Sequence, residues 1–428
     1  MRWPVASVMF VLAAAACGSD APSGTDPGNN TIAAPNATNV AAIVVDAGPN
    51  GASGSPVGYV NGAFVTVTVC IPGTASCQDI DHVLVDTGSS GLRLLANDGR
   101  AGGELNLALP EEKDAAGNTV AECAQFLDGF TWGPVLTADL KIAGERAQHV
   151  PVQLISQVKY SVPASCESVG IDEGTLEGSS GLGVNGILGV GLFLQDCGGA
   201  CAIDPSAGNP GVYYACSSSG CASTAVATSA QVTNPVSLFP VDNNGVIIEL
   251  PIVGPSGAPR VTGSLVFGIG TQPNNNPGSA TVFPVDSGGN IATLFPLNGT
   301  SYGSFIDSGS NGIFFLSGRT SGIPVCSGTG GIDGFYCPAA PLALSAANQG
   351  NGSNRNAQVN FAIANAQTLL ATNNSAFGNL GGPSTSTTPQ PGQPESFDWG
   401  LPFFLGRNVF TAIEGARTPA GSGPYFAY

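Results

Sequence analysis

Hydrophobic and polar residues alternate with a period of two along several short stretches of the chain. Residues 64–69, 138–142 and 150–154 show this alternation, which is typical of strands with one buried face. Residues 246–248 and 264–267 are short apolar runs bounded by turn-forming residues, as in buried strands. Few windows of helical length carry apolar residues at a period of 3.6. The pattern therefore predicts a mainly β protein.

The composition agrees with short strands joined by many turns. The 428 residues include 61 Gly and 32 Pro, more than a fifth of the chain, which leaves little room for long helices. With 43% hydrophobic residues the chain can bury a large core. At ~100–200 residues per domain, we expect roughly two domains or lobes.

The charge balance excludes one class of partner. The chain has 12 Lys and Arg against 29 Asp and Glu, a net charge of −17 at pH 7. Such a surface repels phosphate backbones, so nucleic-acid binding is excluded. The two histidines, His82 and His149, leave little material for a His-rich metal site, and we expect no metal or other cofactor.

The N-terminus has the pattern of a targeting segment. Residues 1–16 contain a short apolar run that ends in small residues, which predicts a signal peptide. The segment resembles a bacterial lipoprotein signal, in which Cys17 would carry the lipid; an ordinary secretory signal cleaved at the same place is the alternative. We expect residues 17–57 to be a lipid-anchored N-terminus and flexible tether, because residues 19–39 are rich in Gly, Pro, Asn, Thr and Ala.

These features predict an exported protein of the cell envelope that contacts the membrane only through its lipid anchor. By resemblance to other lipoproteins, Gly18 after the cysteine favours the outer membrane, on its periplasmic or surface face.

The cysteine count supports export. The chain has 11 cysteines, and if Cys17 carries lipid, an even number remains, which is typical of disulfides. We expect mostly local bridges: Cys70–Cys77, Cys216–Cys221, Cys326–Cys337, Cys123–Cys166 and Cys197–Cys201.

An internal repeat is the most informative feature of the sequence. Two apolar runs end in Asp-Thr-Gly and Asp-Ser-Gly, with their acids at Asp86 and Asp307. About a hundred residues after each acid comes an apolar-apolar-Gly motif, at residues 187–189 and 404–406. A third Asp-Ser-Gly, at Asp286, has no such partner, and we interpret it as a capped turn.

With this doubled motif, the chain resembles the pepsin-type aspartic peptidases. The resemblance covers roughly residues 58–428 and implies a mainly β, two-lobed fold with a pseudo-twofold internal repeat. The lobes would be residues 58–243 and 244–428. The spellings VDTGSSGLRLL, DWGLPFF and DNNGV also resemble a bacterial exported family known only as a domain of unknown function.

The resemblance implies that Asp86 and Asp307 meet between the lobes, share a proton and activate a water molecule for peptide hydrolysis. The residues that would support the two acids are Thr87, Gly88 and Ser89 in the first lobe and Ser308, Gly309 and Ser310 in the second. The residues that would pack beneath the two acid loops are Ile187, Leu188, Gly189, Phe404, Leu405 and Gly406.

The chain departs from the family at the flap, a hairpin that covers the cleft and carries a tyrosine near its start. The matching candidates are Phe126, Asp128, Gly129 and Trp132. Phe126 replaces the tyrosine, and Trp132 either supplies a hydrogen-bond donor instead or only fills the hairpin core. Arg407 stands where the family has an acid after Leu-Gly. Residues 196–223 are an insertion that forms a disulfide-stapled surface loop or shapes a substrate subsite.

Two functions from different classes remain open. The first is an aspartic endopeptidase, a monomer that acts on polypeptide substrates in a cleft between β lobes. The second is a catalytically silent protein of the same fold that binds peptide or a cell-envelope partner. A serine hydrolase built on Ser89 with His82 or His149 is disfavoured, because the surrounding residues do not form a nucleophile elbow.

Overall fold

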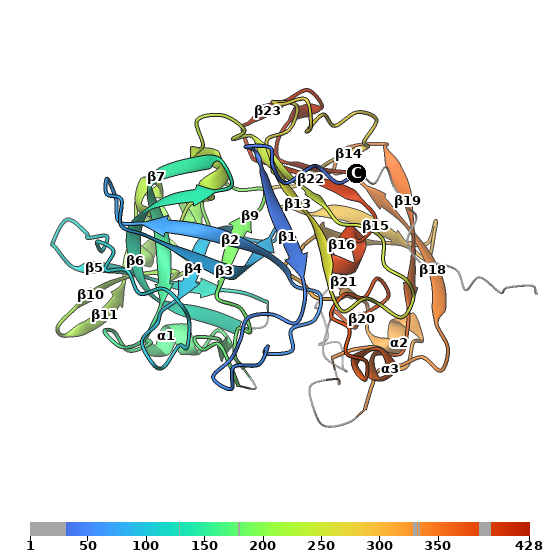
Figure 1. The fold of residues 1–428 in the computed structure, drawn as a ribbon, viewed down its shortest axis with the longest axis horizontal. Coiled ribbons are helices and arrows are strands. Elements are labelled where there is room, and N and C mark those ends of the chain that lie inside the picture. The colour runs from blue at the N-terminus through green and yellow to red at the C-terminus, as the bar shows by residue number, and fades with distance from the viewer. Residues whose placement is uncertain (1–30, 128, 179, 328–331, 333, 385–394) are drawn as a thin grey trace, which may run out of the picture.

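The computed structural model describes residues 31–127, 129–178, 180–327, 332, 334–384 and 395–428. Figure 1 shows two β lobes side by side, the first in blue and green and the second in orange and red. The prediction of a mainly β, two-lobed fold is therefore confirmed. The predicted signal peptide, Cys17 and Asp128 lie outside the described residues.

The first lobe is a mainly antiparallel structure with some parallel pairs, and its valine- and leucine-rich strands bury their apolar faces in the main core. Its strands are β2 (Ala63–Cys70), β3 (Cys77–Asp86), β4 (Ser90–Leu95), β5 (Thr119–Gln125), β6 (Gly129–Ile142), β7 (Glu145–Ile155), β8 (Ile171–Asp172), β9 (Gly186–Val190), β10 (Tyr213–Ser217) and β11 (Gly220–Ser223). The helical segments are α1 (Ala164–Glu167), η1 (Gly198–Ala202), η2 (Pro205–Ala207), η3 (Thr228–Ala230) and η4 (Pro235–Leu238). The strands predicted at residues 64–69, 138–142 and 150–154 are confirmed as parts of β2, β6 and β7.

The second lobe contains a separate seven-stranded sheet in the order β19-β18-β15-β16-β21-β17-β20. The strands of this half are β12 (Gly245–Glu249), β13 (Val261–Phe267), β14 (Val282–Pro284), β15 (Ile291–Phe295), β16 (Thr300–Ile306), β17 (Ile313–Phe315), β18 (Leu342–Gln349), β19 (Asn356–Ile363), β20 (Gly381–Gly382), β21 (Ser396–Trp399), β22 (Asn408–Ala412), β23 (Arg417–Thr418), β24 (Gly421–Ser422) and β25 (Tyr425–Ala427). Its helices are α2 (Gly318–Ser321), α3 (Ala366–Leu370) and α4 (Leu401–Phe404). The strands predicted at residues 246–248 and 264–267 are confirmed as β12 and β13.

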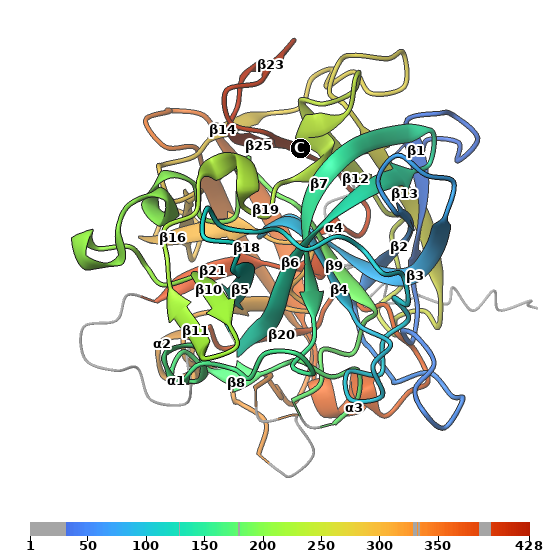
Figure 2. The same cartoon turned by 90° about the vertical axis from the view of Figure 1, so that its left-hand side faces the viewer.

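A strand from the N-terminal segment joins the two lobes. β1 (Val40–Val45) pairs antiparallel with β2 of the first lobe and with β13 of the second half. Figure 2 shows β1, β2 and β13 together at one side of the molecule. Ile43 and Val45 are buried in the main core. The prediction of a flexible tether up to residue 57 is wrong for this stretch, because its apolar residues form a core strand.

The internal repeat of the sequence is visible in the strand pairing. In the first lobe, β3 pairs in parallel with β9, and β9 pairs antiparallel with β4. In the second lobe, β16 pairs in parallel with β21, and β21 pairs antiparallel with β17. In each three-strand unit, one acid lies at the end of the first strand: Asp86 ends β3, and Asp307 directly follows β16.

The five disulfides have the predicted pairing. The bridges are Cys70–Cys77, Cys123–Cys166, Cys197–Cys201, Cys216–Cys221 and Cys326–Cys337. Each of them closes a loop within one half of the chain. No helix in the described part of the chain has the length and apolar character needed to cross a membrane.

Candidate active site

The first acid loop follows directly from β3. Asp86 is the last residue of this strand and is only 6% exposed. Its Oδ1 accepts a hydrogen bond from the N–H of Gly88 at 2.8 Å, and its Oδ2 accepts one from the hydroxyl of Ser89. The tight turn after the strand therefore holds both carboxylate oxygens in place.

The second acid loop repeats this arrangement. Asp307 follows β16 immediately, and its Oδ1 accepts a hydrogen bond from the N–H of Gly309 at 2.8 Å. The hydroxyl of Ser310 donates to Oδ2 at 2.9 Å. The same residue spacing thus gives the same local geometry in both lobes. By contrast, Asp286 accepts hydrogen bonds from the N–H groups of Gly288 and Asn290 in an exposed turn, as predicted for this third triplet.

The hydroxyl residues next to the acids bind the two loops to each other. The N–H of Thr87 donates to Ser308 Oγ at 3.1 Å, and the N–H of Ser308 donates to Thr87 Oγ1 at 2.9 Å. The hydroxyl of Thr87 also donates to the carbonyl of Ile306 at 3.0 Å, and that of Ser308 donates to the carbonyl of Val85 at 2.6 Å. All four bonds cross between the lobes and are buried, so they fix the acid loops relative to one another.

The two carboxyl groups face each other across this interface. A Cβ atom added to Gly88 would lie 2.7 Å from Cγ of Asp307, and one added to Gly309 would lie 2.7 Å from Oδ1 of Asp86. Only glycine therefore fits beside each opposing acid. Burial, the charge of Asp86 and the charge of Asp398 together raise the pKa of Asp307 well above its ordinary value.

The residues beside the first acid are those that the sequence predicts. Val85 pairs with Leu188 and Asp86 pairs with Gly189 in the parallel β3–β9 ladder. Ile187 and Leu188 are buried behind the loop.

The corresponding prediction for the second acid is wrong. Ile306 pairs with Trp399, and the carbonyl of Trp399 accepts the N–H of Asp307 at 3.1 Å. The residues in the place expected for Phe404, Leu405 and Gly406 are therefore Asp398, Trp399 and Gly400. Phe404 ends the short helix α4, and Leu405 and Gly406 instead pair with Leu250 near β12. The motif beside the second acid is residues 398–400, and it is hard to recognise in the sequence because its first position is the polar Asp398 and not an apolar residue.

Because the motif beside the second acid is residues 398–400, Arg407 is not the residue that follows it. The residue after the true motif is Leu401, the first residue of α4. Arg407 is buried further on, where its guanidinium lies 4.5 Å from the centre of the Phe403 ring and donates to the Phe403 carbonyl. Arg407 therefore does not stand at the position that follows the motif beside the second acid.

The flap candidates belong to the β5–β6 hairpin. The N–H of Phe126 donates to the carbonyl of Gly129 at 2.8 Å at the turn. Trp132 is fully buried, and its Nε1 donates to the carbonyl of Tyr160 at 2.9 Å. Trp132 is therefore part of the hairpin core, which is the second of the two alternatives, and its indole N–H is used within the first lobe.

The hairpin is attached along both edges. β10 pairs antiparallel with β5, and β8 pairs in parallel with the start of β6. The Cys123–Cys166 disulfide ties β5 to α1. β10 and β11 come from the predicted insertion at residues 196–223, so the insertion extends the flap sheet.

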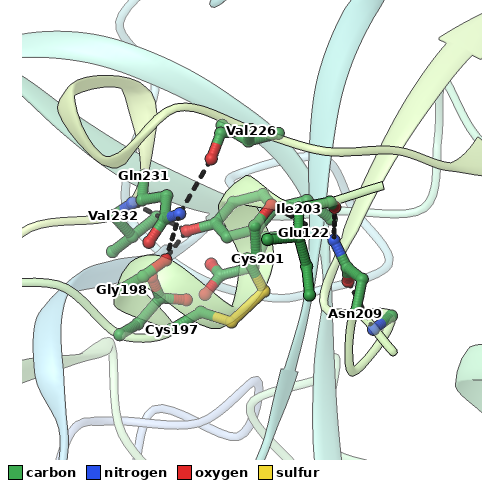
Figure 3. The surroundings of a disulfide bond; sticks show 12 residues. Glu122, Cys197, Gly198, Cys201, Ile203, Asn209, Val226, Gln231 and Val232 are labelled. Carbon is green, nitrogen blue, oxygen red and sulfur yellow. Dashed lines mark hydrogen bonds between the residues drawn. A yellow bond between two sulfur atoms is a disulfide. The ribbon is translucent and has the colours of Figure 1, made fainter. Parts of the chain in front are cut away.

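The predicted disulfide stapling of this insertion is confirmed by two bridges within it. Figure 3 shows the first bridge, Cys197–Cys201, with the amide of Gln231 donating to the carbonyls of Gly198 and Val226 nearby. A role of the insertion in a substrate subsite stays a prediction.

A buried ionic cluster behind the flap is a feature that the sequence analysis missed. Arg93 on β4 lies 2.5 Å from Glu122 on β5 and 3.5 Å from Asp196, and all three are at most 7% exposed. The hydroxyl of Tyr213 donates to Asp196 at 2.7 Å. Burial raises the pKa of Glu122 well above its ordinary value, although Arg93 acts in the opposite direction.

Arg93 connects this cluster to the first acid loop and to the flap. Its guanidinium donates to the carbonyl of Ser90 at 3.0 Å and lies 5.7 Å from the centre of the Phe126 ring. The sequence signal for this role is a single arginine inside the otherwise apolar run that follows Asp86.

A cavity of about 390 Å³ opens between the lobes beside the second acid loop. Its lining includes Tyr59, Leu182, Asn311, Phe335 and Leu380. Nearby, the fully buried Asn61 donates to the carbonyls of Asn311 and Phe377, so it also joins the first half of the chain to the second. The cavity is lined by both polar and apolar groups and is large enough for side chains of an extended peptide.

The two histidines lie apart from these features. The ring of His82 contacts Asp46 and Asp81, while the hydroxyl of Ser89 is bonded to Asp86, so a serine triad with His82 does not form. Among the described residues, no three His, Cys, Asp or Glu side chains are placed to hold a metal ion.

Comparison with known proteins gives a family and a fold. The model of the family described as "Protein of unknown function (DUF3443)" matches residues 35–428. No curated protein matches the chain. The solved structure of an aspartic proteinase from Irpex lacteus is similar with a TM-score of 0.51 at 16% identity, over 91% of this chain and 96% of that chain. At this identity, the similarity shows a pepsin-like fold and not an activity.

Proposed function

We propose that this chain, which belongs to the DUF3443 family of unknown function, is an aspartic endopeptidase. The observation that carries the proposal is the pair of carboxyl groups of Asp86 and Asp307, which face each other across the lobe interface. Each is held by one backbone N–H and one serine hydroxyl. Two carboxyl groups with one shared proton can act together as general acid and general base.

The environment favours one distribution of the proton. Burial and two neighbouring carboxyl groups raise the pKa of Asp307. The proposal therefore places the shared proton on Asp307 and gives Asp86 the role of base. Asp86 takes a proton from water as the water oxygen attacks the peptide carbonyl carbon, and Asp307 gives its proton to the carbonyl oxygen. Asp86 then passes its proton to the amide nitrogen. The C–N bond breaks as one hydroxyl of the intermediate returns a proton to Asp307.

The same proposal assigns the substrate to the space between the lobes. The cavity beside Asn311, which has both polar and apolar lining, supplies a place for substrate side chains next to the second acid loop. The rigid bonding of Thr87 and Ser308 keeps the two acids in register while the substrate binds.

For the location, the disulfides support an oxidising compartment outside the cytoplasm. We propose attachment to the outer membrane through lipid on Cys17, with the two lobes on the periplasmic or surface face.

The experiment is incubation of the purified full-length chain, in mild detergent, with an unfolded protein at pH values from 3 to 7. We expect cleavage that is blocked by a peptide containing statine, a mimic of the tetrahedral intermediate. Complete absence of cleavage at every pH without the inhibitor contradicts the proposal, whether or not the statine peptide binds to the protein.

One observation favours a second function. The flap hairpin is bound along both edges and by the Cys123–Cys166 bridge, and Phe126 has no hydroxyl to offer a substrate. A chain with a fixed flap suits a catalytically silent protein that binds peptide or a cell-envelope partner. Saturable binding of peptides that remain intact in the same assay supports this alternative.

A further inference from the structure

A third carboxyl group lies one strand away from Asp307. Asp398 on β21 pairs with Phe305 on β16, two residues before Asp307. Side chains two apart along a strand share a face, and paired residues on adjacent strands project to the same side. Asp398 and Asp307 are therefore on the same face of the sheet. Their neighbours Phe397 and Trp399 pack into the aromatic core on the other face.

The surroundings of Asp398 strengthen its effect on Asp307. Asp398 is only 4% exposed and is flanked in register by the half-buried rings of Phe305 and Phe314. With so little water between them, like charges on two carboxyl groups repel each other strongly. This repulsion contributes to the raised pKa of Asp307, together with burial and Asp86.

The other titratable groups near this face are few. Asp86 faces the pair from β3. β17 carries no ionisable side chain, and the one in β16, Tyr302, packs against Phe397 on the opposite face of the sheet. Glu395 is engaged elsewhere, by the N–H of Ser317 and the hydroxyl of Thr320.

The first lobe shows that the fold does not require an acid at this position. There Leu84 and Ile187 occupy the paired positions that Phe305 and Asp398 occupy in the second lobe. Ile187 is buried in an apolar cluster. The acid is thus present on one side only of an otherwise repeated arrangement.

We propose that Asp398 is a positioning residue that keeps the shared proton on the Asp86–Asp307 pair. The inference rests on the proposed peptidase function, and it concerns the pH range in which that peptidase is active. A negative charge on Asp398 opposes a second negative charge on the pair, so the singly protonated, active form of the pair persists to higher pH than in the absence of Asp398. An enzyme with this device works closer to neutral pH.

The test compares the full-length chain with Asp398→Asn, which keeps the size and removes the charge. In the pH profile of kcat/KM for peptide cleavage, we expect the alkaline limb to move to lower pH by about one unit. At a fixed pH on that limb, kcat/KM should fall about tenfold. Asp286→Asn, in an exposed turn, is the matched control and leaves the limb in place. A limb that moves equally little in both variants overturns the inference.

A second measurement does not depend on cleavage. NMR titration of chains labelled with 13C at the aspartate carboxyl carbon follows the pair directly, with Asp86→Asn and Asp307→Asn used for assignment. We expect the highest titration midpoint of the parent to fall by about one unit in Asp398→Asn. An unchanged midpoint, or a parent in which every aspartate titrates near its ordinary value, overturns the inference.

These readouts separate the two proposals. If the parent cleaves nothing, the peptidase function fails, and the NMR titration still decides the role of Asp398. If Asp398→Asn does not fold, Asp398→Ile, which copies the first lobe, replaces it with the same expected shift.

Discussion

Replacement of Thr87 by Val removes one hydroxyl at the lobe interface and keeps the shape of the side chain. In the parent, Thr87 Oγ1 donates to the carbonyl of Ile306 at 3.0 Å and accepts the N–H of Ser308 at 2.9 Å, and both bonds are buried. The variant leaves that carbonyl and that N–H without this partner. Because each unsatisfied buried group costs about 1–3 kcal/mol and the variant leaves two of them, we expect the free energy of unfolding to fall by about 2–6 kcal/mol.

Activity should fall as well, because the lost bonds connect the two acid loops. The assay is urea unfolding followed by the fluorescence of the buried Trp132 and Trp399, together with peptide cleavage. Thr66→Val, at an exposed position on β2, is the matched control, and Thr87→Ser should retain most of the stability. If Thr87→Val unfolds at the same urea concentration as Thr66→Val, the cross-lobe bonds do not contribute as we argue.

Three further predictions concern other parts of the chain. Cys17→Ser should move the protein from the membrane to the soluble fraction after export; identical fractionation of variant and parent contradicts lipid attachment. Loss of the Cys123–Cys166 bridge, which closes a separation of 43 residues, should cost about 4 kcal/mol and speed hydrogen exchange in β5 and β6; unchanged exchange contradicts a flap held by the bridge. Burial raises the pKa of Glu249 from 4.5 to about 7, so the folded state binds its proton more tightly than the unfolded state and loses stability as pH rises from 4.5 through 7. Glu249→Gln should reduce this loss in urea unfolding measured between pH 4 and 8, and an identical pH dependence in variant and parent contradicts it.

The local features of the fold were accessible from the sequence because they depend on residues close together in the chain. The period-two runs form β2, β6 and β7, and all the disulfides except Cys123–Cys166 join cysteines at most 11 residues apart. The doubled Asp-hydroxyl-Gly motif placed both acids at strand ends, because an apolar strand followed by a glycine turn has the same local geometry in both lobes.

The features that were missed depend on pairing between distant residues. The strand beside the second acid was misplaced because Asp398 interrupts the apolar pattern, and only the register of β16 and β21 identifies it. β1 looked like a continuation of the polar tether, and its place is evident only from its pairing with β13, more than two hundred residues away. Arg93 and Glu122 become recognisable as partners only when β4 and β5 are placed in space.

The most direct measurement of the central claim compares peptide cleavage by the parent with that by Asp86→Asn and Asp307→Asn at the pH of highest activity. Each variant removes one carboxyl group and keeps the size of the side chain, and circular dichroism and urea unfolding verify that the fold is retained. We predict that both single variants lose cleavage completely, because the shared proton needs both acids, and that Asp286→Asn retains it. Cleavage by either acid variant at a rate comparable to that of the parent contradicts the account.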